Sequence, residues 1–319
     1  MIAVIEITPW HWIGFIVCVL VFIALDLGVF RRGERVVVFR EALAWSALWF
    51  TLAMGFAGLM VHWRGREEAT EFATGYLLEL SLSLDNILVI VLIFAAFRVP
   101  AEWQHRVLTW GVIGAIAMRG VMIAIGAELV RNFSWILYLF GMFLVFTGVK
   151  MLWQRKSPPP LEKNRMLRLI RKVFPVTPGF EGRNFFSRLN GKFALTPLAL
   201  VLLVVETTDL IFAVDSVPAV FSVTRKAFIV FTSNVFAIVG LRSFYFLLAG
   251  AIGRFRYLKA GLSVVLVFVG AKMLLDPHGR QPKWFQFEIS TEVSLLAIIL
   301  ILSTSITVSV LARQEQKSG

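Results

Sequence analysis

Long apolar stretches separated by short polar connections run along most of this chain. A helix that crosses a membrane needs roughly 20 mostly apolar residues. The stretches of this length lie near residues 10–30, 41–62, 73–97, 107–130, 134–153, 195–222, 227–250, 256–275 and 290–312. No Lys or Arg precedes the first stretch, so we expect a retained helix rather than a signal peptide. The pattern predicts an all-α polytopic membrane protein with about nine transmembrane helices.

The positive charges in the connections predict how these helices are oriented. With the N-terminus outside, the cytoplasmic segments carry 21 Lys and Arg residues and the external segments carry 7. An excess of Lys and Arg on the cytoplasmic side is the usual pattern in membrane proteins. Nine spans then place the C-terminus in the cytoplasm.

Composition agrees with a membrane protein and narrows the function. Only 16% of the residues are charged and 58% are hydrophobic, which excludes an ordinary water-soluble domain. The net charge of +12 is explained by the cytoplasmic Lys and Arg, so no nucleic-acid partner is needed. The single cysteine, Cys18, excludes a disulfide framework and a thiolate cluster.

One connection, residues 154–194, is long enough to be a separate element. It carries ten of the 21 cytoplasmic positive charges. Leu167, Ile170 and Phe174 recur at helical spacing among basic residues, which is typical of an amphipathic helix on an anionic membrane surface. A solvated loop with a short helix is the alternative. We interpret this segment as a basic cytoplasmic linker.

Two parts of the chain resemble each other in order. GVKMLW from Gly148 matches GAKMLL from Gly270 at an offset of 122, and Arg119 pairs with Arg242 at 123. At an offset of 130, the acidic motifs of the two parts also align. Each part holds three spans, so the second copy is inverted, as in many secondary transporters. A duplication that serves packing alone is the alternative.

This repeat divides the chain into five segments. They are two N-terminal transmembrane helices (1–72), a first three-helix repeat (73–153), the cytoplasmic basic linker (154–194), a second, inverted three-helix repeat (195–275), and a C-terminal transmembrane helix with its tail (276–319).

Acidic residues inside the two matching segments are the most specific signal. A carboxylate in a bilayer is costly and marks a functional site by default. The candidate metal ligands are Glu79, Asp85, Asn86, Glu206, Asp209 and Asp215. All are oxygen donors, which favours Mn²⁺, Mg²⁺ or Ca²⁺ over copper or zinc. Five crowded carboxylates exceed the need of one divalent ion, so proton-coupled exchange is a hypothesis.

Four further residues are candidates for accessory or charge-balancing roles: Asp26, Ser216, Arg119 and Arg242. The two arginines are expected to pair with carboxylates, yet against five acidic residues they leave a formal charge of −3. Residues six apart on one helix point about 120° away from each other. We therefore expect interrupted helices at both acidic motifs, since these would let the ligands converge.

Three segments of this chain resemble a known family. GYLLELSLSLDNILV, VVETTDLIFAVDSVPAVF and TSNVFAIVGLRSFYFLLAG are similar to motifs of the TerC family of integral membrane proteins, in the LysE-like transporter group, and are closest to its Alx branch. The resemblance implies a bacterial inner-membrane protein of manganese export or homeostasis. It also implies that the acidic motif residues form the functional site.

The leading hypothesis is a non-enzymatic divalent metal-ion transporter that exports manganese(II) by alternating access. It has no permanently bound cofactor, Mn²⁺ is the transported ion, and its partners are the metal ion and the lipid bilayer. A TerC-like membrane partner that helps load manganese onto exported proteins, through secretion-machinery proteins, is the alternative. An intramembrane aspartyl protease is a third class, but its usual YD and GxGD signatures are absent from the acidic motifs.

Overall fold

The computed structural model describes residues 7–30, 39–153, 174–189, 191–249, 258–276 and 286–318. The helices in these ranges are α1 (Pro9–Phe30), α2 (Phe39–Trp63), α3 (Arg66–Ala96), α4 (Ala101–Asn132), α5 (Ile136–Trp153), α7 (Pro197–Phe221), α8 (Ala227–Ala249), α9 (Leu258–Leu275) and α10 (Thr291–Ser318). Strands β1 (Phe186–Leu189) and β2 (Lys192–Leu195) form an antiparallel hairpin.

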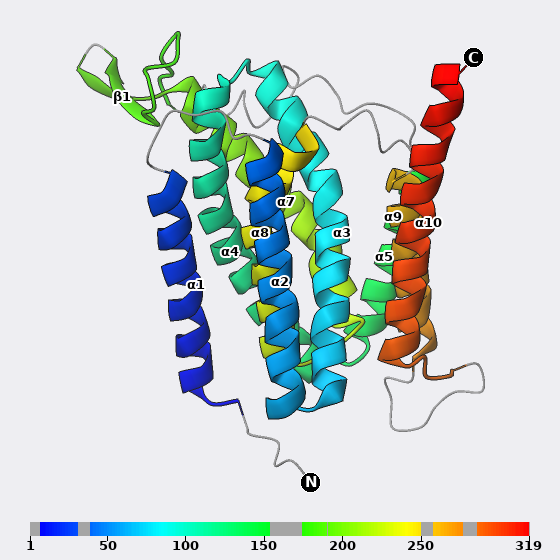
Figure 1. Ribbon diagram of the computed structural model, residues 1–319. Helices are drawn as coiled ribbons and strands as arrows, with labels where there is room; N and C mark the ends of the chain where they lie inside the picture. The colour runs from blue at the N-terminus through cyan, green and yellow to red at the C-terminus, as the bar shows by residue number, and fades with distance from the viewer. Residues whose placement is uncertain are drawn as a thin grey trace.

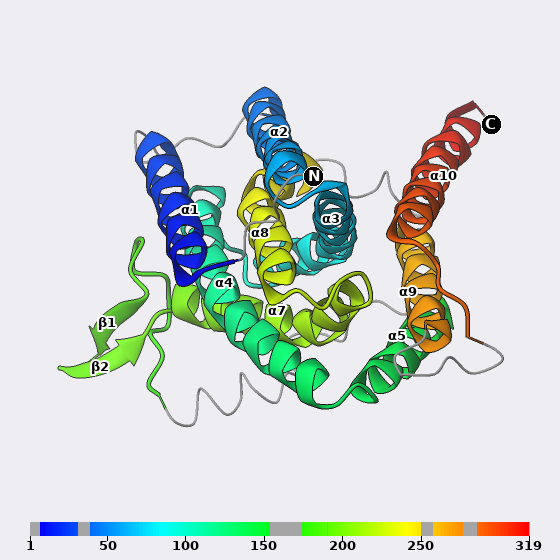
Figure 2. The same ribbon diagram turned by 90° about the horizontal axis from the view of Figure 1, so that it is seen from below.

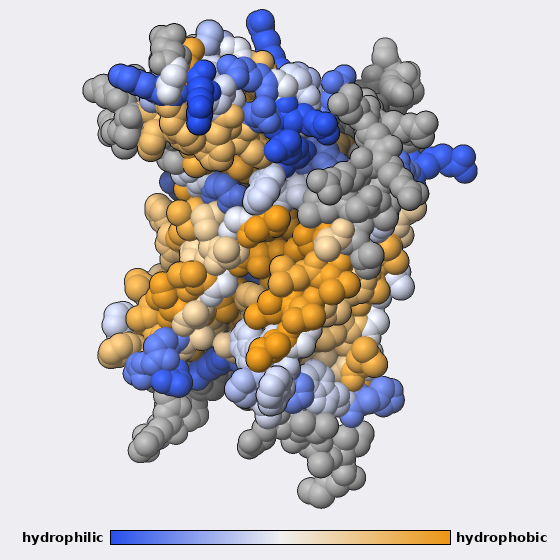
Figure 3. Space-filling view, turned by 90° about the vertical axis from the view of Figure 1, so that its left-hand side faces the viewer, coloured by the Kyte–Doolittle hydropathy of each residue, from blue (hydrophilic) through white to orange (hydrophobic). Residues whose placement is uncertain are grey.

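The helices have the length and composition of a membrane protein. Over the described residues, seven are long and apolar enough to cross a bilayer: α2, α3, α4, α5, α7, α8 and α10. Hydrophobic residues cover the middle of the face seen in Figure 3, and hydrophilic residues gather toward its two ends. The prediction of an all-α polytopic membrane protein is confirmed. The count of nine spans, the five segments and the repeat stay predictions.

The helix bundle has two ends that differ in what they carry (Figure 1). α1 begins at one end, which we call the N-terminal face. The hairpin β1–β2 and the end of α10 lie at the opposite end, which we call the linker face. The two termini thus lie on opposite faces, with the hairpin on the side of the C-terminus, as the predicted topology requires. That the linker face is cytoplasmic stays a prediction.

Helix α8 lies inside the bundle, with α2, α3, α4 and α7 around it (Figure 2). Its sequence fits this position, because the span from Ala227 to Leu248 is mostly apolar and is the most buried of the candidate spans. Its neighbours α3, α4 and α7 carry the acidic and basic motif residues. The bundle therefore brings both halves of the candidate site to the same central helix.

Helices α5 and α9 pack against each other along small residues. A Cβ atom added to Gly270 would lie 2.7 Å from the backbone oxygen of Gly141, and one added to Gly148 would lie 2.8 Å from that of Ser263. At the offset of 122, Gly148 corresponds to Gly270 and Gly141 to Ser263. Each contact is thus the counterpart of the other, as a two-fold relation between the repeats requires. This contact supports the predicted repeat.

The expectation of interrupted helices at the acidic motifs is wrong. α3 and α7 are both continuous helices through these motifs. The hydroxyl groups that were expected to break them bond back along the helix instead: Ser81 donates to the carbonyl of Leu77 at 2.5 Å and Thr208 to that of Val204 at 2.7 Å. Pro218 lies in the last turn of α7, where it leaves the acidic motif helical.

The linker was predicted as a basic cytoplasmic segment, and its described part contains the hairpin. The register pairs Phe186 with Leu195 and Leu189 with Lys192, and Gly191 adopts a φ of +77° in the turn. Thr196 then caps α7 by accepting a hydrogen bond from the amide of Ala199 at 3.3 Å. The predicted amphipathic helix falls almost entirely on residues 154–173, outside the described residues.

Candidate metal-ion site

Arg119 joins acidic residues of the two halves at the centre of the bundle. The guanidinium group, from α4, forms an ion pair with Glu79 on α3 through Nη1. It also binds both oxygens of Asp209 on α7, with Nη2 at 3.0 Å from Oδ1 and Nε at 3.2 Å from Oδ2. The Glu79 side chain is fully buried, and that of Asp209 is 14% exposed. Residues aligned by the repeat therefore share one cation.

Polar side chains complete the first layer around these charges. Arg119 Nη1 donates to Asn234 Oδ1 at 2.9 Å and to Ser216 Oγ at 3.3 Å. Asn234, on α8, in turn donates through Nδ2 to Glu79 Oε2 at 3.1 Å. Such hydrogen bonds are needed because an ion pair stripped of water is stable only when its remaining polar atoms are satisfied. The cluster is thus a closed network of helices α3, α4, α7 and α8.

Asn86 adds a weaker contact at the edge of this network. Its amide Nδ2 lies 3.5 Å from Asp209 Oδ1, at the limit of a hydrogen bond. At the offset of 130, Asn86 is the counterpart of Ser216, which touches the same arginine. Asn86 and Ser216 therefore both lie at the central cluster, and so do Glu79 and Asp209, the other pair aligned at this offset.

Glu206 lies beside the cluster in a small cavity. The cavity has a volume of about 20 Å³ and is lined by Glu206, Asp209, Arg119 and apolar side chains. This is enough space for one water-sized group. Among the described residues, Glu206 Oε2 is buried without a hydrogen-bond partner. The carboxylate also feels the repulsion of Asp209, one helical turn away on α7.

A glycine makes the space that Glu206 occupies. A Cβ atom on Gly114 of α4 would overlap the carboxylate oxygens of Glu206. The Glu206 carboxylate can lie here only because residue 114 is a glycine and has no side chain. Glu206 is held where a positive group entering the cavity would contact both it and Asp209.

Asp85 and Asp215 do not join the central cluster. Because α3 and α7 are continuous, each lies six residues beyond a cluster residue and points about 120° away from it. Asp85 instead feels the positive charge of Lys259 near the start of α9. Asp215 accepts a hydrogen bond from Thr147 of α5 at 3.3 Å. Both aspartates thus face the α5–α9 side of the bundle.

The remaining predicted residues lie elsewhere. Arg242 is buried on α8 and donates to Thr109 Oγ1 of α4 at 3.1 Å, on the linker-face side of the cluster. Asp26 belongs to α1, but its side chain lies outside the described residues. Within the described ranges, no group of three or more His, Cys, Asp or Glu side chains is placed to hold a metal ion. In this arrangement Arg119 is the counter-charge of the central carboxylates.

Comparison with known proteins identifies the family. The model of the integral membrane protein TerC family matches residues 64–317. The chain belongs to the TerC family. Its TerC relatives include a Myxococcus xanthus protein described as "Uncharacterized membrane protein STKORF319", which is 50% identical over 95% of this chain and 93% of its own length. No solved structure matches the chain.

Further TerC relatives are described as "Putative membrane-bound redox modulator Alx". The protein of this description from Escherichia coli (strain K12) is 43% identical over 98% of each chain, and the one from Salmonella typhi is 44% identical over 93% of this chain and 94% of its own length. The resemblance to the TerC family and its Alx branch, predicted from three motifs of the sequence, is confirmed.

Sequence reasoning missed two residues of the central cluster. Asn234 was not predicted as a ligand, although it lies in one of the motifs that carry the resemblance. Its signal was a buried amide in the middle of an apolar helix, which is costly without partners. Gly114 has no sequence signal of its own, because its importance depends on which side chain faces it across α4 and α7.

Proposed function

We propose that this protein is a divalent metal-ion transporter that exports manganese(II) from the cytoplasm by alternating access. The observation that supports the proposal most strongly is an ion-pair cluster. Glu79 and Asp209, which come from the two halves of the chain, both pair with the buried guanidinium group of Arg119. A site shared by two repeats near the middle of the membrane is the usual arrangement in secondary transporters. The proposed function is non-enzymatic.

The charge of the centre fits a divalent ion. Glu79, Asp209 and Glu206 carry three formal negative charges against the single positive charge of Arg119, which leaves −2. An ion of charge +2 in the cavity would neutralise this excess and satisfy the buried oxygen of Glu206. The available donors are carboxylate and amide oxygens, which suit Mn²⁺ and other hard divalent cations.

Between transport events, the guanidinium group of Arg119 takes the place of the transported ion at the carboxylates. A cation that reaches Glu206 and Asp209 competes with the guanidinium group for the same oxygens. When it binds, Arg119 keeps Glu79 and Asn234 as partners while it releases Asp209. An ion that binds one set of these contacts better than the other shifts the equilibrium between two conformations, and such a shift can drive alternating access. Protons taken up by the crowded carboxylates after the metal leaves would couple the cycle to inward proton flow.

The proposal assigns the faces as well. The linker face, which carries the hairpin with the basic residues Arg188 and Lys192, lies in the cytoplasm, and the N-terminal face lies outside. The protein is placed in the inner membrane of a bacterium, as the bacterial origin of its relatives suggests. The relatives' name mentions a redox modulator; with Cys18 as the single cysteine of this sequence, a dithiol couple within one chain is excluded.

The test is manganese uptake into everted membrane vesicles that contain the parent protein or one of three variants. Asp209→Asn and Glu206→Gln remove charge at the centre, and Glu128→Gln removes an exposed carboxylate on α4 as a matched control. We expect uptake to fall by about tenfold or more in the first two, because the loss of one charged ligand costs more than 1.4 kcal/mol. The control should transport like the parent.

Two outcomes would count against the proposal. If both central variants transport like the parent, the metal does not pass through this site. If the parent takes up no manganese while exported enzymes lose theirs in its absence, the alternative of a membrane partner that assists manganese loading is favoured. A stable complex with secretion-machinery proteins would support that alternative further.

A further inference from the structure

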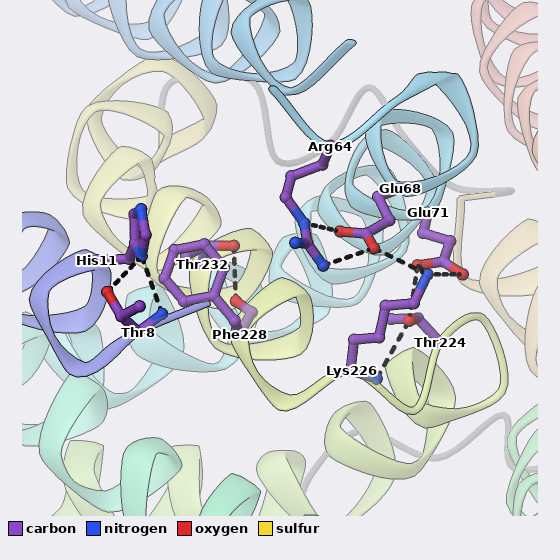
Figure 4. A network of polar contacts seen from close by, with 9 residues as sticks. All are labelled: Thr8, His11, Arg64, Glu68, Glu71, Thr224, Lys226, Phe228 and Thr232. Atoms are coloured by element: carbon purple, nitrogen blue, oxygen red, sulfur yellow. Dashed lines mark hydrogen bonds and ion pairs between the residues drawn. The ribbon is translucent and has the colours of Figure 1, made fainter. Parts of the chain in front are cut away.

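A second charged network closes the bundle at its N-terminal face (Figure 4). Lys226, just before α8, places Nζ at 3.2 and 3.3 Å from the two carboxylate oxygens of Glu71 and at 3.3 Å from Glu68 Oε1. Arg64 forms two hydrogen bonds with Glu68, at 2.6 and 2.8 Å. The two acidic and two basic groups make a neutral network.

The network ties together elements from the two halves of the chain. Glu68 and Glu71 lie at the start of α3, whereas Lys226 and Thr224 lie in the turn between α7 and α8. Thr224 Oγ1 donates to Glu71 Oε2 at 2.8 Å and accepts from the amide of Lys226 at 3.2 Å. The turn is therefore fixed to α3 through the Thr224 hydroxyl as well as through its lysine.

The charges of this network are held in place by their surroundings. The Glu68 and Glu71 side chains are 8% and 9% exposed, and Lys226 is 40% exposed. Burial alone would lower the pKa of Lys226, but the negative charges of Glu71 and Glu68 outweigh it and raise the pKa. Lys226 consequently stays charged at neutral pH and keeps its partners.

The bundle is tightly packed between this network and the central site. A Cβ atom on Gly75 of α3 would lie 3.0 Å from Ser233 Oγ of α8 and 3.1 Å from a methyl group of Val220 of α7. The Ser233 and Val220 side chains are fully buried. These three helices are therefore closely packed around Gly75.

The other side of the central site is packed less tightly. The cavity beside Glu206 is lined by Ile90, Leu108 and Leu241, which lie nearer to the linker face than Arg119 does. The space next to the central carboxylates therefore extends toward the linker face, while on the N-terminal side α3, α7 and α8 are closely packed around Gly75 and joined by the charged network.

We propose that Lys226, Glu68 and Glu71 form a latch that holds the N-terminal end of the transport pathway closed in this structure. The proposal rests on the proposed transport function. The latch must break for the bundle to open toward the N-terminal face, because it joins α3 of one half to the α7–α8 turn of the other. Glu71 is also attracted by Lys272 of α9, and Lys226 is paired with both Glu68 and Glu71, so the loss of either Glu71 or Lys226 removes two attractions.

Cysteine labelling tests the latch without measuring transport. Ser233→Cys is introduced into a Cys18→Ser background, and the purified protein in lipid nanodiscs is treated with a maleimide. Position 233 is buried between the latch and the central site. The rate of labelling therefore reports how often the N-terminal end of the bundle opens. We expect labelling to be about fivefold faster or more with Lys226→Gln and also with Glu71→Gln.

Two further variants keep the result interpretable. Lys226→Arg preserves the positive charge and should label as slowly as the parent. A general loss of folding would instead speed the labelling of both Lys226→Gln and Lys226→Arg. Glu128→Gln breaks an exposed ion pair with Arg131, on the same face but within one helix, and should leave the rate unchanged. Equal rates in the parent, Lys226→Gln and Glu71→Gln would overturn the latch, even if manganese transport at the central site is intact.

Discussion

Replacing Arg119 by glutamine tests how the two halves are held together. The change removes the shared partner of Glu79 and Asp209 and leaves them with the amide hydrogen bonds of Asn234, at 3.1 Å, and Asn86, at 3.5 Å. Removal of one member of a buried ion pair typically costs about 3–5 kcal/mol, because the other charge stays buried without compensation. We expect the free energy of unfolding to fall by about this amount.

The matched control is Arg131→Gln, at the exposed end of α4. Arg131 pairs with Glu128 at 2.9 Å, and its side chain is 76% exposed. Exposed ion pairs contribute about 0–1 kcal/mol, so this variant should unfold close to the parent. Denaturant unfolding in detergent micelles, followed by tryptophan fluorescence, compares the three proteins.

Manganese should partly restore the Arg119→Gln variant, because the ion can take the place of the guanidinium group. A ligand at 100 times its dissociation constant stabilises the folded state by about 2.7 kcal/mol. If the free energy of unfolding falls no more in Arg119→Gln than in Arg131→Gln, Arg119 does not hold the two halves together. Failure of Mn²⁺ to stabilise Arg119→Gln at any concentration would refute the exchange of counter-charges.

Two glycine substitutions give further predictions, with Gly55→Ala on α2, where an added Cβ meets nothing within 4 Å, as their common control. Gly114→Ala should displace Glu206 and strongly reduce manganese uptake in everted vesicles while the protein is still made; uptake at the parental rate would show that the position of Glu206 is unimportant. Gly270→Ala should lower the free energy of unfolding by about 1–3 kcal/mol, since its Cβ would lie 2.7 Å from the backbone oxygen of Gly141. Unfolding like that of the control would show that α5 and α9 can separate freely.

The helices were predictable from sequence because the bilayer imposes a minimum length on each apolar stretch. For example, the stretch near 107–130 became α4 (Ala101–Asn132), extended at both ends by polar residues that hydropathy alone does not count. The hairpin of β1 and β2 was not predicted. Its strands have four residues each, too few to give a clear alternating pattern.

The centre of the site was predictable in part. The predicted repeat aligned Glu79 with Asp209, and both contact Arg119, which was also a candidate residue. Asp85 and Asp215 were expected at the same centre on the premise that their helices break. Continuous helices point them elsewhere, since hydroxyl groups in a helix can satisfy the preceding turn as readily as they can end it. Only the three-dimensional arrangement distinguishes these two outcomes.

Direct binding of Mn²⁺ to the purified protein tests the central claim. Electron paramagnetic resonance of free Mn²⁺ counts the ions bound by the parent, by Asp209→Asn together with Glu206→Gln, and by the exposed control Glu128→Gln. The account predicts one saturable ion in the parent and in the control, and loss of that ion in the double variant. Retention of the ion by the double variant, with the affinity of the parent, would contradict it.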